Sequence, residues 1–92
     1  MRIIAEAEKE GFKVTVFKYE EKVSVKLERD QMEYLHKFRQ GAVIADAASA
    51  LSYVDNMFEN GFMESHHKAI EQQMKSLRLL ISAQQDQFPK II

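Results

Sequence analysis

The period of the hydrophobic pattern changes once along this 92-residue chain, near Gly41, and the change sets the order of the predicted elements. Residues 12–28 alternate between apolar and polar side chains around the segment KYEEK. Alternation with period two and many β-branched residues is typical of half-buried strands, so we expect a β-hairpin here. The turn lacks Asn-Gly or Asp-Gly, which predicts a loop of roughly three to five residues. The apolar face of this hairpin, here called the inner face, carries Phe12, Val14, Val16, Val23, Val25 and Leu27.

Two further strands are predicted beside the hairpin. Residues 2–9 suit a strand with Ile3, Ala5 and Ala7 on the inner face, although their alanine and glutamate content suits a helix equally well. Residues 32–39 also alternate, and we favour a fourth strand over a short helix.

After Gly41 the apolar residues recur at helical spacing. A first helix is predicted over 42–60, ending at the segment ENG because Asn and Gly readily adopt the left-handed conformation that follows a helix. A second helix is predicted over 62–84, followed by an apolar tail over 85–92. The first helix has a stripe of Ile44, Ala47, Ala48, Leu51, Val54 and Phe58, and the second has one of Met63, His66, Ile70, Met74, Leu77 and Ile81.

These elements predict one small α+β domain over residues 1–92, with its β-sheet region in 1–40. The expected fold is an antiparallel four-stranded β-meander followed by a two-helix hairpin packed on one sheet face, in the order ββββαα. A chain this short buries a limited core and often needs a disulfide, a metal or a partner. Disulfides are excluded because the chain has no cysteine, which also fits a reducing cytoplasm. Oligomerisation is therefore the expected supplement.

Apolar residues in excess of one small core indicate an interaction surface. We expect this interface at Leu79, Phe88, Ile91 and Ile92. The first functional hypothesis is a non-enzymatic cytoplasmic protein with a regulatory, inhibitory or adaptor role, acting as a homodimer or with another protein. Membrane insertion is not expected, since no stretch approaches the roughly 20 apolar residues of a spanning helix.

The opposite, outer face of the predicted sheet gives the second hypothesis, single-stranded nucleic-acid binding. Cations and an aromatic ring gather there at Lys13, Phe17, Lys26, Lys37 and Arg39. Aromatic platforms inside basic grooves bind single strands. Acidic residues share this face and would repel phosphate, however, and cross-strand Lys–Glu pairs explain the same pattern. These residues are Glu6, Glu8, Glu28 and Glu33.

The segment FMESHHKAIEQQ gives a third hypothesis, a metal-binding dimer. Glu64, His67 and Glu71 lie on one side of the predicted helix, and Glu-x-x-His is a metal-binding pattern in helical bundles. Such sites need two motifs, whereas this chain has one. A solvated helix face with a His67–Glu71 pair is the simpler interpretation, so we expect no cofactor.

Catalysis is not expected either. The chain has no cysteine and no Gly-rich phosphate loop, and its serines lie in no activating context. No motif is specific enough to name a family.

Overall fold

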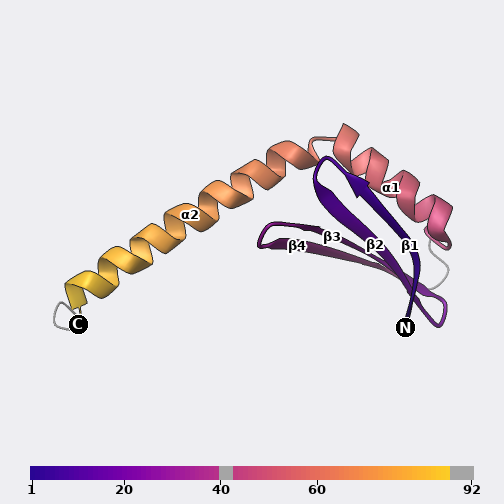
Figure 1. The fold of residues 1–92 in the computed structure, drawn as a ribbon, viewed down its shortest axis with the longest axis horizontal. Helices are drawn as coiled ribbons and strands as arrows, with labels where there is room; N and C mark the ends of the chain where they lie inside the picture. Colours follow the sequence, from indigo (N-terminus) through magenta and orange to yellow (C-terminus); the bar gives the residue numbers. More distant parts are fainter. Residues whose placement is uncertain (40–42, 88–92) are drawn as a thin grey trace. The chain divides into compact units, whose positions relative to one another are not determined.

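The computed structural model describes residues 1–39 and 43–87, with side chains as far as residue 84 (Figure 1). One antiparallel sheet contains β1 (Arg2–Lys9), β2 (Phe12–Tyr19), β3 (Lys22–Arg29) and β4 (Met32–Phe38), in that order. The helices α1 (Ala47–Glu59) and α2 (Phe62–Gln87) follow the sheet in sequence. The predicted ββββαα order is confirmed, and both uncertain segments are strands.

The chain divides into two compact units, Met1–Asn56 and Met57–Ile92, and each is described by itself. The helix bounds differ from the prediction. The first helix begins at Ala47 instead of residue 42, and the second continues to Gln87 instead of ending at 84.

The three hairpins of the sheet close through two-residue turns, so the predicted longer loop is wrong. Tyr19 pairs directly with Lys22, which leaves Glu20 and Glu21 as the whole β2–β3 turn. Glu20 has a φ of 58°, in the left-handed region. A tight turn between right-twisted strands needs this conformation, and here a non-glycine residue adopts it. The tight turn was not predicted because the Asn or Gly that usually marks such a turn is absent here.

Replacing Glu20 with glycine is expected to stabilise the sheet by about 1 kcal/mol, because a non-glycine residue in the left-handed region carries roughly 1–2 kcal/mol of strain. Glu21→Gly is the matched control. Glu21 is not among the residues with positive φ, so the glycine there adds only conformational freedom to the unfolded chain and lowers stability. Urea unfolding of both variants measures the difference. Equal effects at the two positions would show that Glu20 is not strained.

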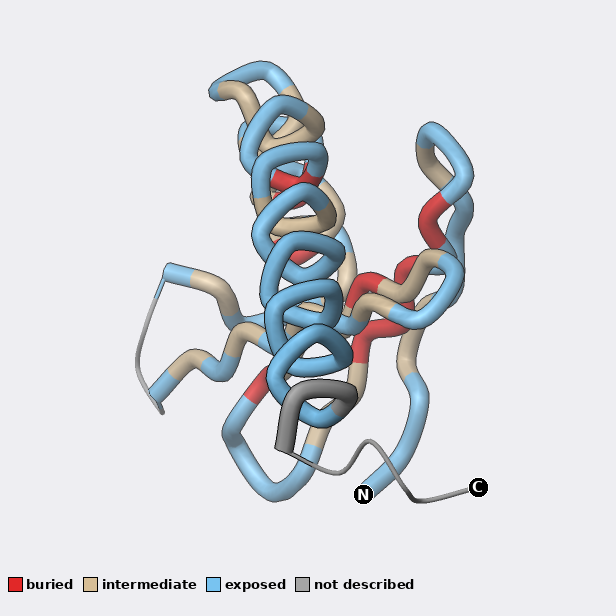
Figure 2. Tube along the Cα trace, turned by 90° about the vertical axis from the view of Figure 1, so that its left-hand side faces the viewer, coloured by how far each residue is buried: buried red, intermediate tan, exposed pale blue. Residues whose placement is uncertain are grey.

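The inner face of the sheet forms the core as predicted. All six residues predicted for it are at most 1% exposed, and Ala50 and Val54 of α1 are also buried (Figure 2). The centre of the α1 stripe differs from the prediction, however. Ile44 precedes the helix and Ala48 is exposed, since the helix begins later than expected.

Polar and aromatic contacts hold α1 to both edges of the sheet. A hydrogen bond joins Nδ1 of His36 on β4 to the Tyr53 hydroxyl at 2.7 Å. The Phe38 and Tyr53 rings meet edge to face, with centroids 4.9 Å apart. At the opposite edge, Lys9 of β1 forms an ion pair with Asp55 at 2.8 Å. Exposed pairs contribute little, so the aromatic contacts are the stronger of these attachments.

A β-bulge at the start of β1 changes the face of one predicted core residue. The register skips Ile4, pairing Ile3 with Phe17 and Ala5 with Val16. Directly paired residues lie on the same face of a sheet, so Ile3 shares the outer face with Phe17. Ile3 is 53% exposed there, and its predicted inward position is wrong.

Asp46 caps α1 and explains its start. Its Oδ1 accepts hydrogen bonds from the Ser49 backbone N–H at 2.8 Å and from the Ser49 hydroxyl at 2.7 Å. The same hydroxyl oxygen accepts the Asp46 backbone N–H at 3.2 Å, so the cap is reciprocal. These bonds from Ser49, with a smaller contribution from the charge of Lys18, lower the pKa of the Asp46 carboxyl.

The stabilisation that the charged Asp46 cap gives to α1 is expected to be lost in acid. A carboxyl whose pKa is lowered by folding contributes stability at neutral pH, and that contribution disappears as the pH falls below about 4. Asp46→Ala should therefore lower the melting temperature at pH 7 and have a smaller effect at pH 2.5. Asp46→Asn keeps a capping oxygen without the charge, so it should be slightly less stable than the parent at pH 7 and close to the parent at pH 2.5. An Asp46→Ala effect that is the same at both pH values would contradict the role of the charge.

Candidate functional site

The most unusual surface of the described residues is the second half of α2. Every side chain from Glu71 to Gln84 is exposed (Figure 2). Five of them are large and apolar, with exposed fractions from 47% to 63%: Met74, Leu77, Leu79, Leu80 and Ile81. An exposed apolar cluster of this size is typical of an interaction surface.

Helical geometry divides these residues into a stripe and an outlier. At roughly 100° per residue, Met74, Leu77 and Ile81 lie along one line that half-buried Ile70 continues toward the start of the helix. We call Ile70, Met74, Leu77 and Ile81 the α2 stripe. Leu80 borders it on one side, whereas Leu79 projects from the opposite side of the helix.

The interface residues predicted from the sequence overlap little with this exposed apolar surface. Leu79 is exposed but lies away from the α2 stripe, and Phe88, Ile91 and Ile92 lie outside the described residues. Met74, Leu77 and Ile81 were predicted to lie on the apolar stripe of the second helix and were not among the predicted interface residues. Helix length was the available signal: 26 residues of α2 extend about 39 Å, while an eight-residue strand extends about 26 Å. A helix this long in so small a chain predicts apolar side chains that remain exposed along part of its length.

The proposed metal ligands do not form a site in the described part of the chain. Glu64, His67 and Glu71 are all exposed on α2, and the Glu64 carboxylate lies 3.9 Å from the ammonium of Lys68. No group of three or more His, Asp or Glu side chains among the described residues could hold a metal ion. The neighbouring His66 is buried, with its ring stacked on Phe62 at a centroid distance of 6.4 Å.

The outer face of the sheet brings together four of the five residues predicted for nucleic-acid binding. The strand register places Lys13, Phe17, Lys26 and Lys37 on this face, and Arg39 follows the end of β4.

Lys13 and Lys26 lie among carboxylates at one end of the outer face. Lys13 is paired across the sheet with Glu8 and Glu28. The Lys26 ammonium lies 3.4 Å from Glu28 and 3.8 Å from Glu33, and 5.4 Å from the centre of the Phe17 ring. The charges of this half of the face are thus largely balanced, which makes it a poor surface for phosphate.

The other end of the sheet is cationic. Five basic side chains lie near the β2–β3 turn and the end of β4: Arg2, Lys18, Lys22, Lys37 and Arg39. Three acidic side chains accompany them, Glu20 and Glu21 in the turn and Asp46, whose pKa the charge of Lys18 helps to lower. Arg2 and Lys18 are direct cross-strand partners, an arrangement of like charges that favours a nearby anion.

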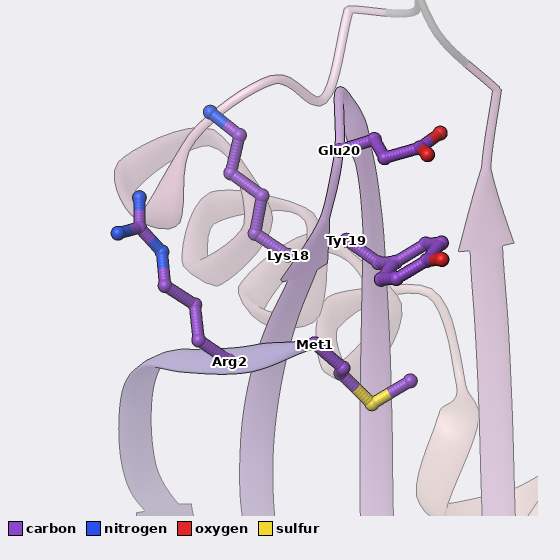
Figure 3. Close-up of a pocket in the computed structure, with 5 residues that line it drawn as sticks. All are labelled: Met1, Arg2, Lys18, Tyr19 and Glu20. Carbon is purple, nitrogen blue, oxygen red and sulfur yellow. The ribbon is translucent and has the colours of Figure 1, made fainter.

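Two hollows lie at this cationic end. One, of about 340 Å³, is lined by Met1, Arg2, Lys18, Tyr19 and Glu20; Arg2 and Lys18 extend to one side of the strands while Tyr19 and Glu20 extend to the other (Figure 3). The second, of about 260 Å³, is lined by Met1, Phe17, Tyr19, Lys22, Ser24, Lys37 and Phe38. Its lining combines aromatic rings with two lysines and contains no carboxylate.

Comparison with protein-family models, with curated proteins and with solved structures found no match to this chain. Among the described residues, neither helix is both long and apolar enough to cross a membrane. The α2 stripe and the cationic end of the sheet are the two candidate interaction surfaces among the described residues.

Proposed function

We propose that this chain is a non-enzymatic protein-interaction domain that acts through α2, with a second copy of itself as the first partner. The observation that carries the proposal is the α2 stripe, together with Leu80 at its border. Four large apolar side chains in this area are about half exposed. Burying them on both copies removes apolar surface from water, which is the main driving force of association.

A regulatory, inhibitory or adaptor role in the cytoplasm is the biological form of this proposal. The chain contains no cysteine, as is common where thiols stay reduced. An adaptor needs no catalytic group, because it acts by binding a partner through its helix surface.

Light scattering over a wide concentration range tests self-association directly. We expect a molar mass that rises from one chain toward two chains as the concentration increases from about 1 to several hundred micromolar, because an interface this small gives modest affinity. A mass of one chain throughout this range would contradict the proposal.

The cationic end of the sheet supports a second candidate function, single-stranded nucleic-acid binding. The 260 Å³ hollow offers Phe17 and Tyr19 for a base and Lys22 and Lys37 for phosphate. This arrangement combines the two contributions that sequence-independent strand binding requires. This candidate site lies at the opposite end of the outer face from Lys13 and Lys26, two of the residues that the sequence hypothesis named.

Lys37→Glu is expected to weaken binding of a labelled single-stranded oligonucleotide and to reduce the salt dependence of its log affinity by about one. Lys13→Glu is the matched control, since it changes net charge equally on the same face but lies among carboxylates. Fluorescence anisotropy at several salt concentrations measures both. Equal losses would indicate a general charge effect, and no binding by the parent chain would exclude this function.

A further inference from the structure

The α2 stripe has the spacing of a coiled-coil seam. Ile70, Met74, Leu77 and Ile81 alternate separations of four, three and four residues. In heptad terms, Ile70 and Leu77 occupy d positions and Met74 and Ile81 occupy a positions. Two helices with this repeat pack by inserting each a or d side chain into a space formed by the other helix.

The edges of the stripe differ in charge. Glu71 and Arg78 lie along one edge, one heptad apart and both exposed, while Gln73 and Leu80 lie along the other. The ion pair described on α2, between Lys68 and Glu64, involves neither Glu71 nor Arg78. One edge therefore carries one acid and one base, and the other carries no charge over the same heptad.

The orientation of a partner helix determines what these edges meet. In a parallel pair, each edge of one helix faces the opposite edge of the other. Arg78 would then face Gln73 of the partner subunit, and Glu71 would face His66 of the partner subunit. In an antiparallel pair, like edges face each other. Glu71 then faces Arg78 of the partner subunit, and the twofold symmetry repeats this ion pair.

The same antiparallel register also fills the seam. When Glu71 is set opposite Arg78 of the partner subunit, Met74 lies in the same layer as Leu77 of the partner subunit. Ile70 likewise shares a layer with Ile81 of the partner subunit. The charged edge and the apolar stripe thus specify one common alignment, in which every layer is apolar and the facing charges are complementary.

We propose that α2 pairs antiparallel with α2 of a second copy, in the register that forms two Glu71–Arg78 ion pairs around Met74–Leu77 and Ile70–Ile81 layers. This inference rests on the proposed self-association and specifies its geometry. The partner is a second copy of this chain, because the edge that carries Glu71 and Arg78 meets complementary charges when an identical edge faces it after a twofold rotation.

Charge exchange tests the register. Glu71→Arg and Arg78→Glu should each weaken homodimers roughly tenfold, because each places like charges opposite one another twice. An equimolar mixture of the two variants should form heterodimers, since every facing pair is then complementary. The double variant, Glu71→Arg with Arg78→Glu, should regain the parent affinity. Circular dichroism establishes that these exposed substitutions keep the helix.

Disulfide formation between introduced cysteines tests the orientation of the two helices. The parent chain has no cysteine, so every disulfide observed comes from the introduced positions. Ile70→Cys and Ile81→Cys should form a disulfide with each other when mixed under oxidising conditions. Each variant alone should form little, because two copies of position 70 would be separated by roughly 16 Å along the axis.

The outcomes separate the two proposals. Disulfides formed by each cysteine variant alone, with no heterodimer preference in the charge mixture, would overturn the antiparallel register while leaving self-association intact. A parent chain that scatters light as a monomer at every concentration would overturn both.

Discussion

Leu77→Glu is expected to keep the chain monomeric at concentrations where the parent chain forms dimers. Leu77 lies between Met74 and Ile81 on the α2 stripe and is 47% exposed. Association would bury the new carboxylate among apolar side chains without a cationic partner in the seam. An unpaired buried charge costs several kcal/mol, so we expect the dimer affinity to fall roughly a hundredfold or more. Light scattering and sedimentation measure the loss.

Leu79→Glu is the control for this prediction. It introduces the same side chain two residues away, in the same helix and at a site that is 63% exposed, but on the opposite side from the stripe. Helix propensity and net charge change equally in the two variants. Leu79→Glu should therefore dimerise like the parent. If it abolished association while Leu77→Glu did not, the interface would lie on the face of Leu79.

The sheet could be predicted from the sequence because alternation directly reports which side chains share a face. A strand has a period of two, so the six inner-face residues needed no tertiary information. Their burial confirms the assignment. The turns were harder to predict because Glu20 adopts a conformation that its side chain disfavours. The pairing of β2 with β3 imposes this conformation on Glu20, and no residue of the turn indicates it in the sequence.

Ile3 shows a second limit of the pattern. Its alternation with Ala5 and Ala7 is regular, yet the bulge at Ile4 moves Ile3 to the outer face. A bulge inserts one residue and thereby changes the face of everything before it. Neither glycine nor proline marks this position, so the sequence offers no reason to expect it.

The candidate sites show the same division between local pattern and register. Which residues lie on the outer face followed from alternation, and this prediction is confirmed for Lys13, Phe17, Lys26 and Lys37. Which of them meet carboxylates depended on pairing across strands. The two-residue turns fix this pairing: they set Lys13 opposite Glu28 and bring Glu33 of β4 within 3.8 Å of Lys26. A different loop length would have changed every neighbour.

Leu27→Ala is expected to remove most of the stability of the sheet. Leu27 is fully buried on the central strand β3, where it pairs with Val14 on one side and Tyr34 on the other. Truncation removes buried methyl groups and leaves a cavity that a hydrogen-bonded sheet can only partly close. Substitutions of this kind cost about 2–5 kcal/mol, a large part of the free energy of unfolding of a small domain. Urea unfolding followed by far-ultraviolet circular dichroism measures the change.

Leu35→Ala supplies the comparison within the same sheet. Leu35 lies on the outer face of β4, paired with Lys26, and is 49% exposed. The chemical change is the same as at position 27, but Leu35 already contacts water, so the expected cost is below about 1 kcal/mol. Similar losses of unfolding free energy at both positions would mean that the two faces contribute equally to the stability of the fold. A large loss at Leu27 alone would establish that the inner face, defined by alternation, supplies the stability of the fold.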